Sequence, residues 1–478
     1  MAKERLFWKR TKIVCTIGPA SDSASIIERL IRAGVNIARL NLSHGSQEEH
    51  AQHIKTIRRI SQRLRTDVAI LMDLPGPKYR TGKLRRGQAT LKKGHQLVVT
   101  TRQVEGDAST VPINLPYLAE DVKPGDTILL DDGAMQLRVM EVRGTDVLCK
   151  VVVGGVLTDG RGLVVPGMSS SRPFVTEALR ANISFAAAQK PAYTALSFVT
   201  CAEDIRASKQ LLQEAGADIP VIAKIERGHA VRNFDAILEA SDGVMVARGD
   251  LGVDIPLERV PLVQKEIVRK ANQSGKPVIT ATEMLESMVN AVRPTRAEVT
   301  DVANAIFDGT DATMLSAETS VGKYPVQAVQ MMARIARAAE RKLPYRELLA
   351  ERGTWLKYET DELISYNACH TAQALDAAAI VAFTQSGSTA GRVSKYRPPV
   401  PVLAISPCSE VCRRLLLRWG VYPYQIPEPS SVDDLFATGV RVAQQHGLAK
   451  SGDVIVITGG LPIGMAGSTN LLKVQQIP

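Results

Sequence analysis

Short, nearly continuous apolar runs alternate with amphipathic segments through the first two thirds of the chain. The runs are 13–18, 35–42, 68–74, 194–199, 221–226, 243–248, 277–282 and 312–318. Runs of this length, rich in Val, Ile and Ala, are typical of parallel strands buried on both faces. Helical periodicity falls between them, in 22–33, 46–64, 203–215, 258–273 and 324–341. This order of strands and helices predicts a closed (β/α)₈ barrel of the TIM type.

The interval between the third and fourth runs breaks the alternation. Residues 75–172 lack helical periodicity and carry turn signals such as Pro75-Gly76-Pro77 and Asp131-Asp132-Gly133. Alternating stretches at 126–130, 136–142 and 147–153 lie between the turns and predict an inserted antiparallel β domain, which we expect to be a small β-barrel. Because the insert follows the carboxyl end of a strand, it lies above the face where barrel active sites form, so we expect it to be a lid.

A second strand-and-helix pattern begins after residue 345. Strands are expected at 378–384, 400–406, 421–426 and 453–458, helices at 361–376, 387–396, 409–418 and 431–446, and an edge strand at 470–477. This pattern predicts an open, doubly wound α/β domain. The expected organisation is a barrel domain (1–74 and 173–345), an inserted β domain (75–172) and a C-terminal α/β domain (346–478).

Composition excludes two classes of partner. No apolar run approaches the roughly 18–20 residues that span a bilayer, and the N-terminus shows no signal-peptide pattern, so we expect a cytoplasmic protein without a membrane partner. The net charge is +10, but the basic residues are dispersed and aromatic residues make up only 4%. Nucleic-acid binding is therefore not expected, whereas a cationic surface attracts anionic, phosphorylated metabolites.

Polar side chains follow the predicted barrel strands at their carboxyl ends, where barrel chemistry gathers. They are Arg39, Asn41, Ser43, His44, Asp73, Lys224, Glu226, Arg248, Asp250, Thr282, Glu283, Ser316 and Glu318. Any one of them is more often part of a structural salt bridge than of a catalytic site. Their convergence on one end of the barrel favours a site.

Two carboxylates among them suit a magnesium ion. Glu226 and Asp250 end neighbouring strands, and no His or Cys accompanies them, which favours Mg²⁺ over zinc. Lys224 lies two residues before Glu226 and faces the same side, where an ammonium neutralises charge on a transferring phosphoryl group. Arg39 offers a planar fork for phosphate oxygens. The pattern indicates metal-assisted chemistry on an anionic, phosphorylated substrate and does not name that substrate.

The chain resembles the pyruvate kinase family along nearly its whole length. The motifs that carry the resemblance stand in the family's order: 11–20 (TKIVCTIGPA), 38–45 (ARLNLSHG), 223–226 (AKIE), 244–253 (VMVARGDLGV), 280–288 (TATEMLESM), 294–298 (PTRAE), 301–305 (DVANA) and 314–319 (MLSAET). The resemblance implies transfer of the phosphoryl group of phosphoenolpyruvate to ADP, giving pyruvate and ATP in the final step of glycolysis. It also implies Mg²⁺ dependence, with Mn²⁺ able to substitute, a regulatory C-terminal domain and a homotetramer.

The resemblance also assigns roles to individual residues. Lys224 matches the lysine that stabilises the phosphoryl group in flight, and Glu226 and Asp250 match the magnesium ligands. Thr282 matches the threonine implicated in protonating the enolate, and the backbone at Arg248 and Gly249 helps to hold substrate. Arg39 matches the phosphate-binding arginine. The implied nucleotide-binding residues are Arg80, Asn41 and His44.

The sequence departs from the family pattern at three places. Asn41, Ser43 and Asp73 match a potassium site that many members complete with a threonine and a glutamate, whereas this chain has Leu74 and Lys78 there. A tethered ammonium can supply the charge of K⁺, so we expect activity without potassium. In addition, Glu283 replaces a usual Gln, and Ala178 and Leu179 replace a Lys-Asp pair near the nucleotide site.

A Ser/Thr-rich turn in the last domain joins a strand end to a helix start. It comprises Thr384, Gln385, Ser386, Gly387, Ser388 and Thr389. Hydroxyls and free N–H groups in such a turn form an anion cradle. The family uses this loop, together with one resembling 459–470, to hold a phosphate of an allosteric effector. We therefore expect a sugar phosphate or AMP as effector.

Two other readings remain open from the sequence. A Mg²⁺-dependent barrel lyase acting on pyruvate-like acids could share the AKIE motif, but it would need neither the insert nor Arg39. A non-catalytic regulatory or RNA-binding relative could keep the fold, but it should have lost Lys224, Asp250 or Thr282, and this chain retains all of them.

Overall fold

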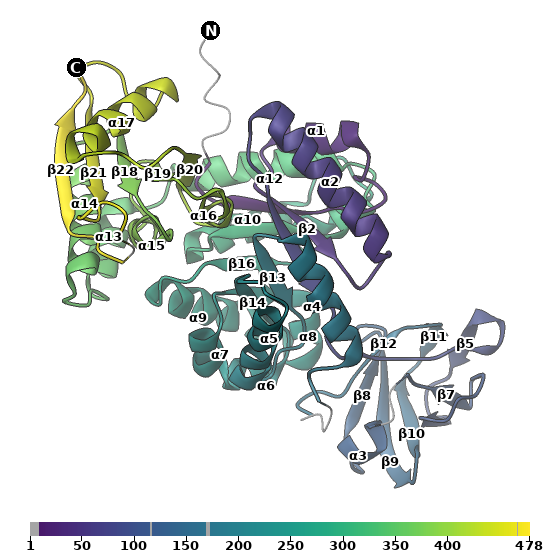
Figure 1. Ribbon diagram of the computed structural model, residues 1–478. Coiled ribbons are helices and arrows are strands. Elements are labelled where there is room, and N and C mark those ends of the chain that lie inside the picture. Colours follow the sequence, from purple (N-terminus) through teal and green to yellow (C-terminus); the bar gives the residue numbers. More distant parts are fainter. Residues whose placement is uncertain (1–8, 115–116, 169–172, 466) are drawn as a thin grey trace.

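A closed barrel of eight parallel strands forms the centre of the molecule in the computed structural model, which describes residues 9–114, 117–168, 173–465 and 467–478 (Figure 1). The strands are β1 (Lys12–Thr16), β2 (Ile37–Asn41), β3 (Ala69–Leu74), β13 (Tyr193–Leu196), β14 (Val221–Ile225), β15 (Gly243–Ala247), β16 (Val278–Ala281) and β17 (Ala312–Leu315). Around the ring they follow chain order, and β1 pairs with β17 to close it. The predicted barrel is confirmed.

Helices surround the barrel. They are α1 (Ala24–Ala33), α2 (Gln47–Leu64), α4 (Glu177–Gln189), α5 (Ala202–Glu214), α6 (Gly228–Arg232), α7 (Phe234–Ala240), α8 (Arg248–Asp254), α9 (Val260–Gln273), α10 (Arg296–Asp308), α11 (Ala317–Ser320) and α12 (Pro325–Glu340). Long ones such as α1 and α12 present an apolar face to the strands. Local signals fix their ends. Ser46 and Glu49 form a capping box at the start of α2, and Gly34 ends α1 in the left-handed region at φ 109°.

The insert between β3 and α4 is a β domain with its own buried core. Its elements are β4 (Tyr79–Arg80), β5 (Gln88–Leu91), β6 (Gln96–Thr100), β7 (Thr110–Pro112), α3 (Leu118–Asp121), β8 (Thr127–Leu130), β9 (Met135–Arg143), β10 (Asp146–Val153), β11 (Gly155–Thr158) and β12 (Gly162–Val164). The described strands form a seven-stranded sheet and a separate two-stranded sheet rather than the single closed barrel that we expected. The separate pair, β5 and β11, consists of strands of only four residues each.

The C-terminal domain is an open five-stranded sheet with helices on both faces, as predicted. Its order is β20 (Val421–Gln425), β19 (Val402–Ser406), β18 (Ala379–Phe383), β21 (Val454–Gly459) and β22 (Leu471–Gln476), with β22 antiparallel at one edge. The helices are α13 (Tyr345–Gly353), α14 (Thr360–Ala374), α15 (Ser388–Lys395), α16 (Ser409–Leu415) and α17 (Val432–Gln445). Side chains of α14, α15 and α16 share one core with the sheet, and those of α17 share another.

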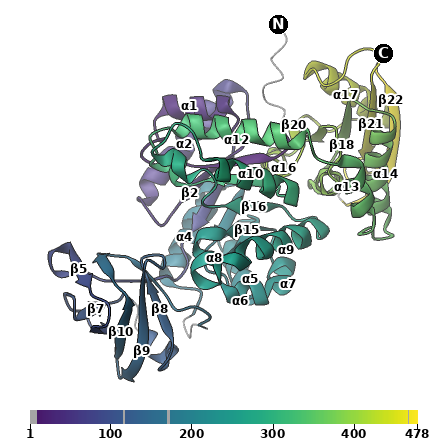
Figure 2. The same ribbon diagram turned by 180° about the vertical axis from the view of Figure 1, so that it is seen from behind.

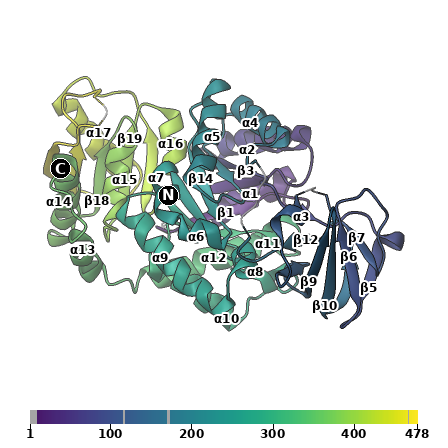
Figure 3. The same cartoon turned by 90° about the horizontal axis from the view of Figure 1, so that it is seen from below.

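The insert and the C-terminal domain lie on opposite sides of the barrel in all three views (Figures 1, 2 and 3). A buried ion pair joins the C-terminal domain to the barrel, between Arg397 Nη1 and Asp311 Oδ1 at 2.7 Å. Our domain boundaries stay predictions, and the one at 172/173 adjoins residues outside the described part of the chain. Within the described residues, no helix has the length and apolar character needed to cross a membrane.

Candidate active site

A buried cluster of opposite charges lies where β2, β3 and β14 end. Asp73 Oδ2 accepts a hydrogen bond from Arg39 Nε at 2.8 Å and lies 2.6 Å from Arg39 Nη2 and 3.3 Å from Lys224 Nζ. Lys224 Nζ also lies 2.8 Å from Glu226 Oε1. Residues that the sequence placed at the ends of three strands therefore converge here: Arg39 from β2, Asp73 from β3, and Lys224 and Glu226 from the end of β14.

Burial and pairing shift the pKa values of these groups. Burial by itself would lower the pKa of Lys224, but the charges of Asp73 and Glu226 outweigh it and raise that pKa, so the ammonium stays charged. Burial would likewise raise the pKa of Asp73, but Lys224 and Arg39 hold it below its usual value. The pKa of Glu226 is raised, first by burial and then by the charge of Asp250, although Lys224 opposes the shift.

Asp250 lies in the first turn of α8, which follows β15, the strand next to β14 and Glu226. Its Oδ1 accepts a hydrogen bond from Lys78 Nζ at 2.8 Å. Burial would raise the pKa of Asp250, but the Lys78 charge outweighs it and holds the pKa below its usual value. The Asp250 side chain is 31% exposed and therefore remains accessible to a ligand.

The two carboxylates fit a divalent cation. Burial is the main cause of the raised pKa of Glu226, and the nearby charge of Asp250 adds to it, so a cation between the two carboxylates would relieve both. All of their donor atoms are oxygens, the ligands that Mg²⁺ prefers. The described residues hold no group of three or more His, Cys, Asp or Glu side chains that could bind a metal by themselves. Glu226 and Asp250 therefore suit a divalent cation that takes its remaining ligands from substrate and water.

Thr282 lies in a strained turn that Arg248 holds in place. Thr282 and Glu283 have φ values of 64° and 53°, in the left-handed region that β-branched and bulky residues rarely adopt. Arg248 donates to the carbonyl oxygens of both residues and pairs with Asp301 at 2.7 Å. The Thr282 hydroxyl accepts a hydrogen bond from the Gly249 N–H at 2.8 Å and donates to the Ala281 carbonyl at 2.6 Å. The Arg248 guanidinium thus positions the Thr282 turn.

The hinge of the insert brings Lys78 to the barrel. A Cβ on Gly76 would lie 2.1 Å from the Ser197 carbonyl oxygen, so only glycine allows this close approach of hinge and barrel. Lys78 Nζ also lies 5.6 Å from the centre of the Phe198 ring and 3.8 Å from Asp132 in the insert. Its ammonium contacts Asp250 and does not join Asn41, Ser43 and Asp73.

Other predicted residues stand apart from this cluster. Asn41 accepts a hydrogen bond from the Ser43 N–H, and the carbonyl oxygen of the exposed His44 lies 2.8 Å from His50 Nε2. Arg80 is exposed on the insert and donates to the Gly160 carbonyl. Glu318 is buried and accepts hydrogen bonds from the N–H groups of two residues, Leu285 and Ser316. The implied nucleotide-binding roles of Arg80, Asn41 and His44 stay predictions.

Two residues that the sequence analysis did not single out complete the cluster. The Ser197 hydroxyl accepts a hydrogen bond from Lys224 Nζ at 2.8 Å and donates to Asp73 Oδ1 at 3.2 Å. Thr16 Oγ1 accepts a hydrogen bond from Arg39 Nη1 at 2.9 Å. Thr16 ends the first barrel strand and Ser197 follows the fourth, so the strand-end rule could have found both.

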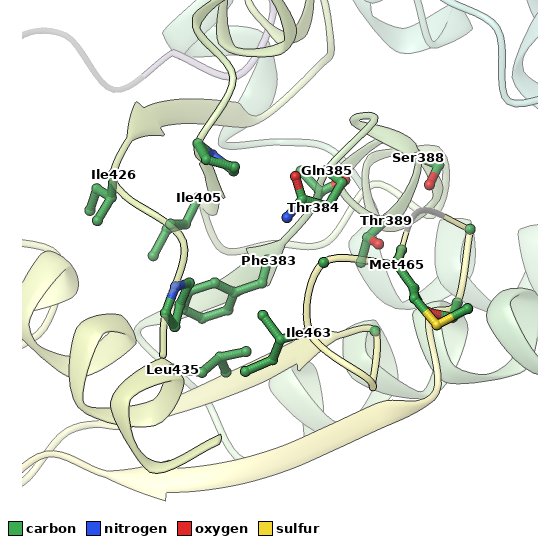
Figure 4. Close-up of a pocket in the computed structure, with 16 residues that line it drawn as sticks. Phe383, Thr384, Gln385, Ser388, Thr389, Ile405, Ile426, Leu435, Ile463 and Met465 are labelled. Carbon is green, nitrogen blue, oxygen red and sulfur yellow. The ribbon is translucent and has the colours of Figure 1, made fainter. Parts of the chain in front are cut away.

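The 384–389 turn joins β18 to α15 and lines a pocket with both polar and apolar walls (Figure 4). The cavity is about 40 Å³, and Phe383, Ile405, Leu435, Ile463 and Met465 are among the side chains that line it. Several polar groups of the turn already have partners. The Thr389 and Thr469 hydroxyls lie 2.8 Å apart, and Gln385 Nε2 donates to Glu428 Oε1 at 2.7 Å.

The fold and the charge cluster define an enzyme of the (β/α)₈-barrel class with a site for an anionic substrate. Comparisons with known proteins are more specific. A family model described as the pyruvate kinase barrel domain matches residues 8–329, and one described as the pyruvate kinase alpha/beta domain matches residues 362–475. The chain belongs to the pyruvate kinase family and is a phosphotransferase.

Curated relatives and solved structures agree with this assignment. The chain is 47% identical to a pyruvate kinase of Geobacillus stearothermophilus, over 98% of this chain and 80% of the relative. It is 44% identical to one of Clostridium acetobutylicum, over 98% of this chain and 100% of the relative. A crystal structure of a pyruvate kinase from Cryptosporidium parvum superimposes with a TM-score of 0.94 at 35% identity, covering 98% of this chain and 96% of the other. The family assignment excludes the lyase alternative.

Proposed function

We propose that the chain transfers the phosphoryl group of phosphoenolpyruvate to ADP at the mouth of the barrel, with Glu226 and Asp250 holding Mg²⁺. The observation that carries this proposal is the buried contact of Lys224 with Glu226 and Asp73, beside Arg39. Fixed cations at a water-poor site stabilise the charge of a transferring phosphoryl group without reorganising. When bound, Mg²⁺ supplies positive charge to the oxygens of both substrates.

Arg39 and Lys224 have complementary roles in this proposal. Arg39 presents its planar guanidinium to the substrate phosphate, and Asp73 and Thr16 hold that guanidinium in place. The Lys224 ammonium, kept charged by Asp73 and Glu226, remains beside the phosphoryl group while it moves between oxygens. Both cations are nearly buried, so little water competes for them.

Thr282 provides a hydroxyl for the last step. Loss of the phosphoryl group leaves an enolate that needs only a proton to become pyruvate. The Thr282 hydroxyl would give its own proton to the enolate carbon, the Gly249 N–H that donates to Thr282 Oγ1 would stabilise the oxygen left negatively charged, and solvent would return the proton. Ketonisation of the enolate makes the overall transfer downhill toward ATP.

A coupled assay of pyruvate formation from phosphoenolpyruvate and ADP tests the proposal, run with Mg²⁺ and again after chelation. We expect turnover that chelation abolishes and that Mg²⁺ or Mn²⁺ restores. Lys209→Met is a matched control for any lysine variant of the site, because Lys209 pairs with Asp242 at 2.9 Å outside the charge cluster. Pyruvate formation that persists after chelation would refute the metal role.

We also propose that this activity does not require K⁺. Lys78 places an ammonium 2.8 Å from Asp250, and this fixed charge adds to the positive charge of the site. Leu74, in turn, offers no side-chain oxygen to a potassium ion. The test is turnover with and without KCl at constant ionic strength, and activation of about ten-fold or more would contradict the proposal.

The C-terminal domain is proposed to bind a phosphorylated effector at the 384–389 turn. Its support is the position of the turn at the start of α15, where free backbone N–H groups favour an anion. Thermal-shift measurements with sugar phosphates and AMP, repeated on Ser386→Ala and Thr389→Ala, test this site. An unchanged melting temperature with every ligand would overturn it.

We further propose a cytoplasmic, glycolytic homotetramer. Leu257 and Leu262 are 73% and 66% exposed near the start of α9, and β22 presents an open sheet edge where Val474 is 43% exposed. Exposed apolar groups and open edges of this kind suit contacts between copies. Light scattering of the purified chain tests the assembly, with Leu262→Glu expected to yield smaller particles. A monomer of the unmodified chain would contradict it.

A further inference from the structure

Phe198 directly follows Ser197 after the end of β13 and has an unusual backbone conformation. Its φ of 59° falls in the left-handed region, which a bulky aromatic residue rarely adopts and which costs free energy to hold. This conformation allows a short hydrogen bond, because the Phe198 N–H donates to Glu226 Oε2 at 2.6 Å. Hydrogen bonds to a carboxylate are among the stronger ones in proteins. The main chain at Phe198 therefore fixes one of the two carboxylates that the proposed function assigns to the metal.

Core packing does not explain the side chain of Phe198. It is only half-buried and borders a cavity of about 280 Å³, which Pro77 and Tyr79 of the insert's hinge and Arg227 of the barrel also line. Another apolar side chain of similar volume would pack against such a cavity as well as phenylalanine does. A role that is specific to an aromatic ring has to come from what lies over its face.

Two cations lie over the Phe198 ring. Lys78 Nζ is 5.6 Å from the ring centre, and the guanidinium carbon of Arg227 is 5.1 Å from it. A cation within about 6 Å of an aromatic ring is attracted by the negative potential of the ring face. Lys78 also pairs with Asp250 at 2.8 Å. Arg227 pairs at 3.3 Å with Asp254, in the last turn of the same helix α8. The ring thus lies where a cation of the hinge and a cation of the barrel meet, beside the helix that carries the second metal carboxylate.

The Lys78 ammonium and a metal ion would use the same carboxylate. Asp250 is 31% exposed, and its Oδ1 is the atom that Lys78 contacts. An ammonium 2.8 Å from that oxygen would be repelled by a divalent ion bound there, so Lys78 needs a second place of negative potential close by. The Phe198 ring and Asp132, which is 3.8 Å from Lys78 Nζ, are both within reach. Because Asp132 is 74% exposed, water screens its charge, and the half-buried ring is the less hydrated partner.

We propose that Phe198 is a positioning residue of the metal site. Its N–H orients Glu226, and its ring receives the Lys78 ammonium when a divalent ion takes Asp250. This inference rests on the proposed metal role of Glu226 and Asp250. It goes beyond that role, because Phe198 acts through Glu226 and Lys78 rather than as a ligand itself.

Mn²⁺ binding to the full chain, followed by electron paramagnetic resonance, tests this role without any turnover. Phe198→Leu removes the aromatic face and keeps a non-glycine residue in the strained main chain, so the N–H that meets Glu226 stays in place. We expect it to weaken Mn²⁺ binding about five-fold to thirty-fold, the range that a partly desolvated contact between a cation and an aromatic ring contributes. Phe198→Tyr keeps the ring face and should bind Mn²⁺ within about two-fold of the unmodified chain.

The same substitution in a Lys78→Met background separates the action of the ring on Lys78 from packing. With no ammonium to receive, Phe198→Leu should change the Mn²⁺ affinity by less than about two-fold. Replacement of Phe198 by trifluorophenylalanine keeps the ring but removes the negative potential of its face. It should weaken Mn²⁺ binding as leucine does, and it tests the role even if Phe198→Leu does not fold. Phe234→Leu is the matched control, because Lys270 lies 5.9 Å from the centre of that ring, outside the site.

The outcomes separate this role from the metal role itself. Weakening by Phe198→Leu that disappears in the Lys78→Met background supports the assignment. Equal weakening in both backgrounds, an equal loss in Phe198→Tyr, or an equal loss in Phe234→Leu overturns it, because the ring face would then not act on Lys78. Asp250→Asn completes the series. If it alone weakens Mn²⁺ binding, only the role of Phe198 is wrong, whereas unchanged binding in Asp250→Asn contradicts the proposed metal role as well.

Discussion

Replacing Lys224 by methionine removes the ammonium between Asp73 and Glu226 and keeps most of the side-chain volume. At an effective dielectric constant of about 20, a unit charge about 3 Å away is worth up to about 5 kcal/mol. Removing one fixed donor at a site of charge development costs about 3–4 kcal/mol of barrier, or about 10²–10³ in rate. Because Lys224 carries a full charge, we expect turnover to fall by about 10³-fold or more.

The same change perturbs folding in a predictable way. Asp73 keeps Arg39 at 2.6 Å, whereas Glu226 Oε1 loses its cation and only Oε2 keeps a partner, the Phe198 N–H. Loss of one partner of a buried pair costs about 3 kcal/mol. Burial already raises the pKa of Glu226, and losing Lys224 raises it further. Because the pKa of Glu226 is higher in the folded chain than in the unfolded chain, this group adds to the free energy of unfolding at acid pH. That contribution is lost as pH rises through the folded pKa.

Steady-state assays of pyruvate formation, with urea unfolding across the pH range, test both parts. Lys209→Met is the control and should keep the turnover of the unmodified chain. The reasoning is refuted if folded Lys224→Met turns over within about ten-fold of the unmodified chain. That result would mean that the Lys224 charge does not lower the activation free energy of phosphoryl transfer.

Three further outcomes follow from the described contacts. Burial would raise the pKa of Asp73, but its neighbouring cations hold that pKa below its usual value of 3.8. The protein therefore loses stability as pH falls through the lower folded pKa of Asp73. In Asp73→Asn, the melting temperature should depend less on pH over this acid range. Lys78→Met removes the cation on Asp250 and should lower turnover in KCl-free buffer about ten-fold, with Lys78→Arg closer to normal. Glu318→Gln leaves one backbone N–H, such as that of Leu285, without its acceptor and should cost about 1–3 kcal/mol in urea unfolding.

The barrel could be predicted from sequence because its strands are buried on both faces. Every residue of β15 is buried, so its apolar run is continuous and its limits are clear. The helix α13 was missed because its apolar residues form no stripe, and only two of its nine residues are buried. The two-stranded sheet of β5 and β11 was missed because a run of four residues shows too few polar–apolar alternations to be recognised as a strand.

The charge cluster was predictable where side chains follow directly from a strand end. Arg39, Lys224 and Glu226 meet because parallel strands carry them to one end of the barrel. Lys78 belongs to the hinge, and its position depends on the packing of Gly76 against Ser197, which no strand-end rule contains. For this reason the sequence placed it with Asn41 and Ser43, whereas its ammonium contacts Asp250.

Binding of Mn²⁺, followed by electron paramagnetic resonance of the full chain, tests most directly whether Glu226 and Asp250 hold one divalent ion beside Lys224. We predict that Glu226→Gln and Asp250→Asn each weaken Mn²⁺ binding by about 10-fold to 100-fold, because each removes a charged oxygen ligand. Asp301→Asn is the control, since Asp301 pairs with Arg248 rather than with the metal-facing groups, and it should bind Mn²⁺ as the unmodified chain does. Unchanged Mn²⁺ affinity in both ligand variants would contradict the account.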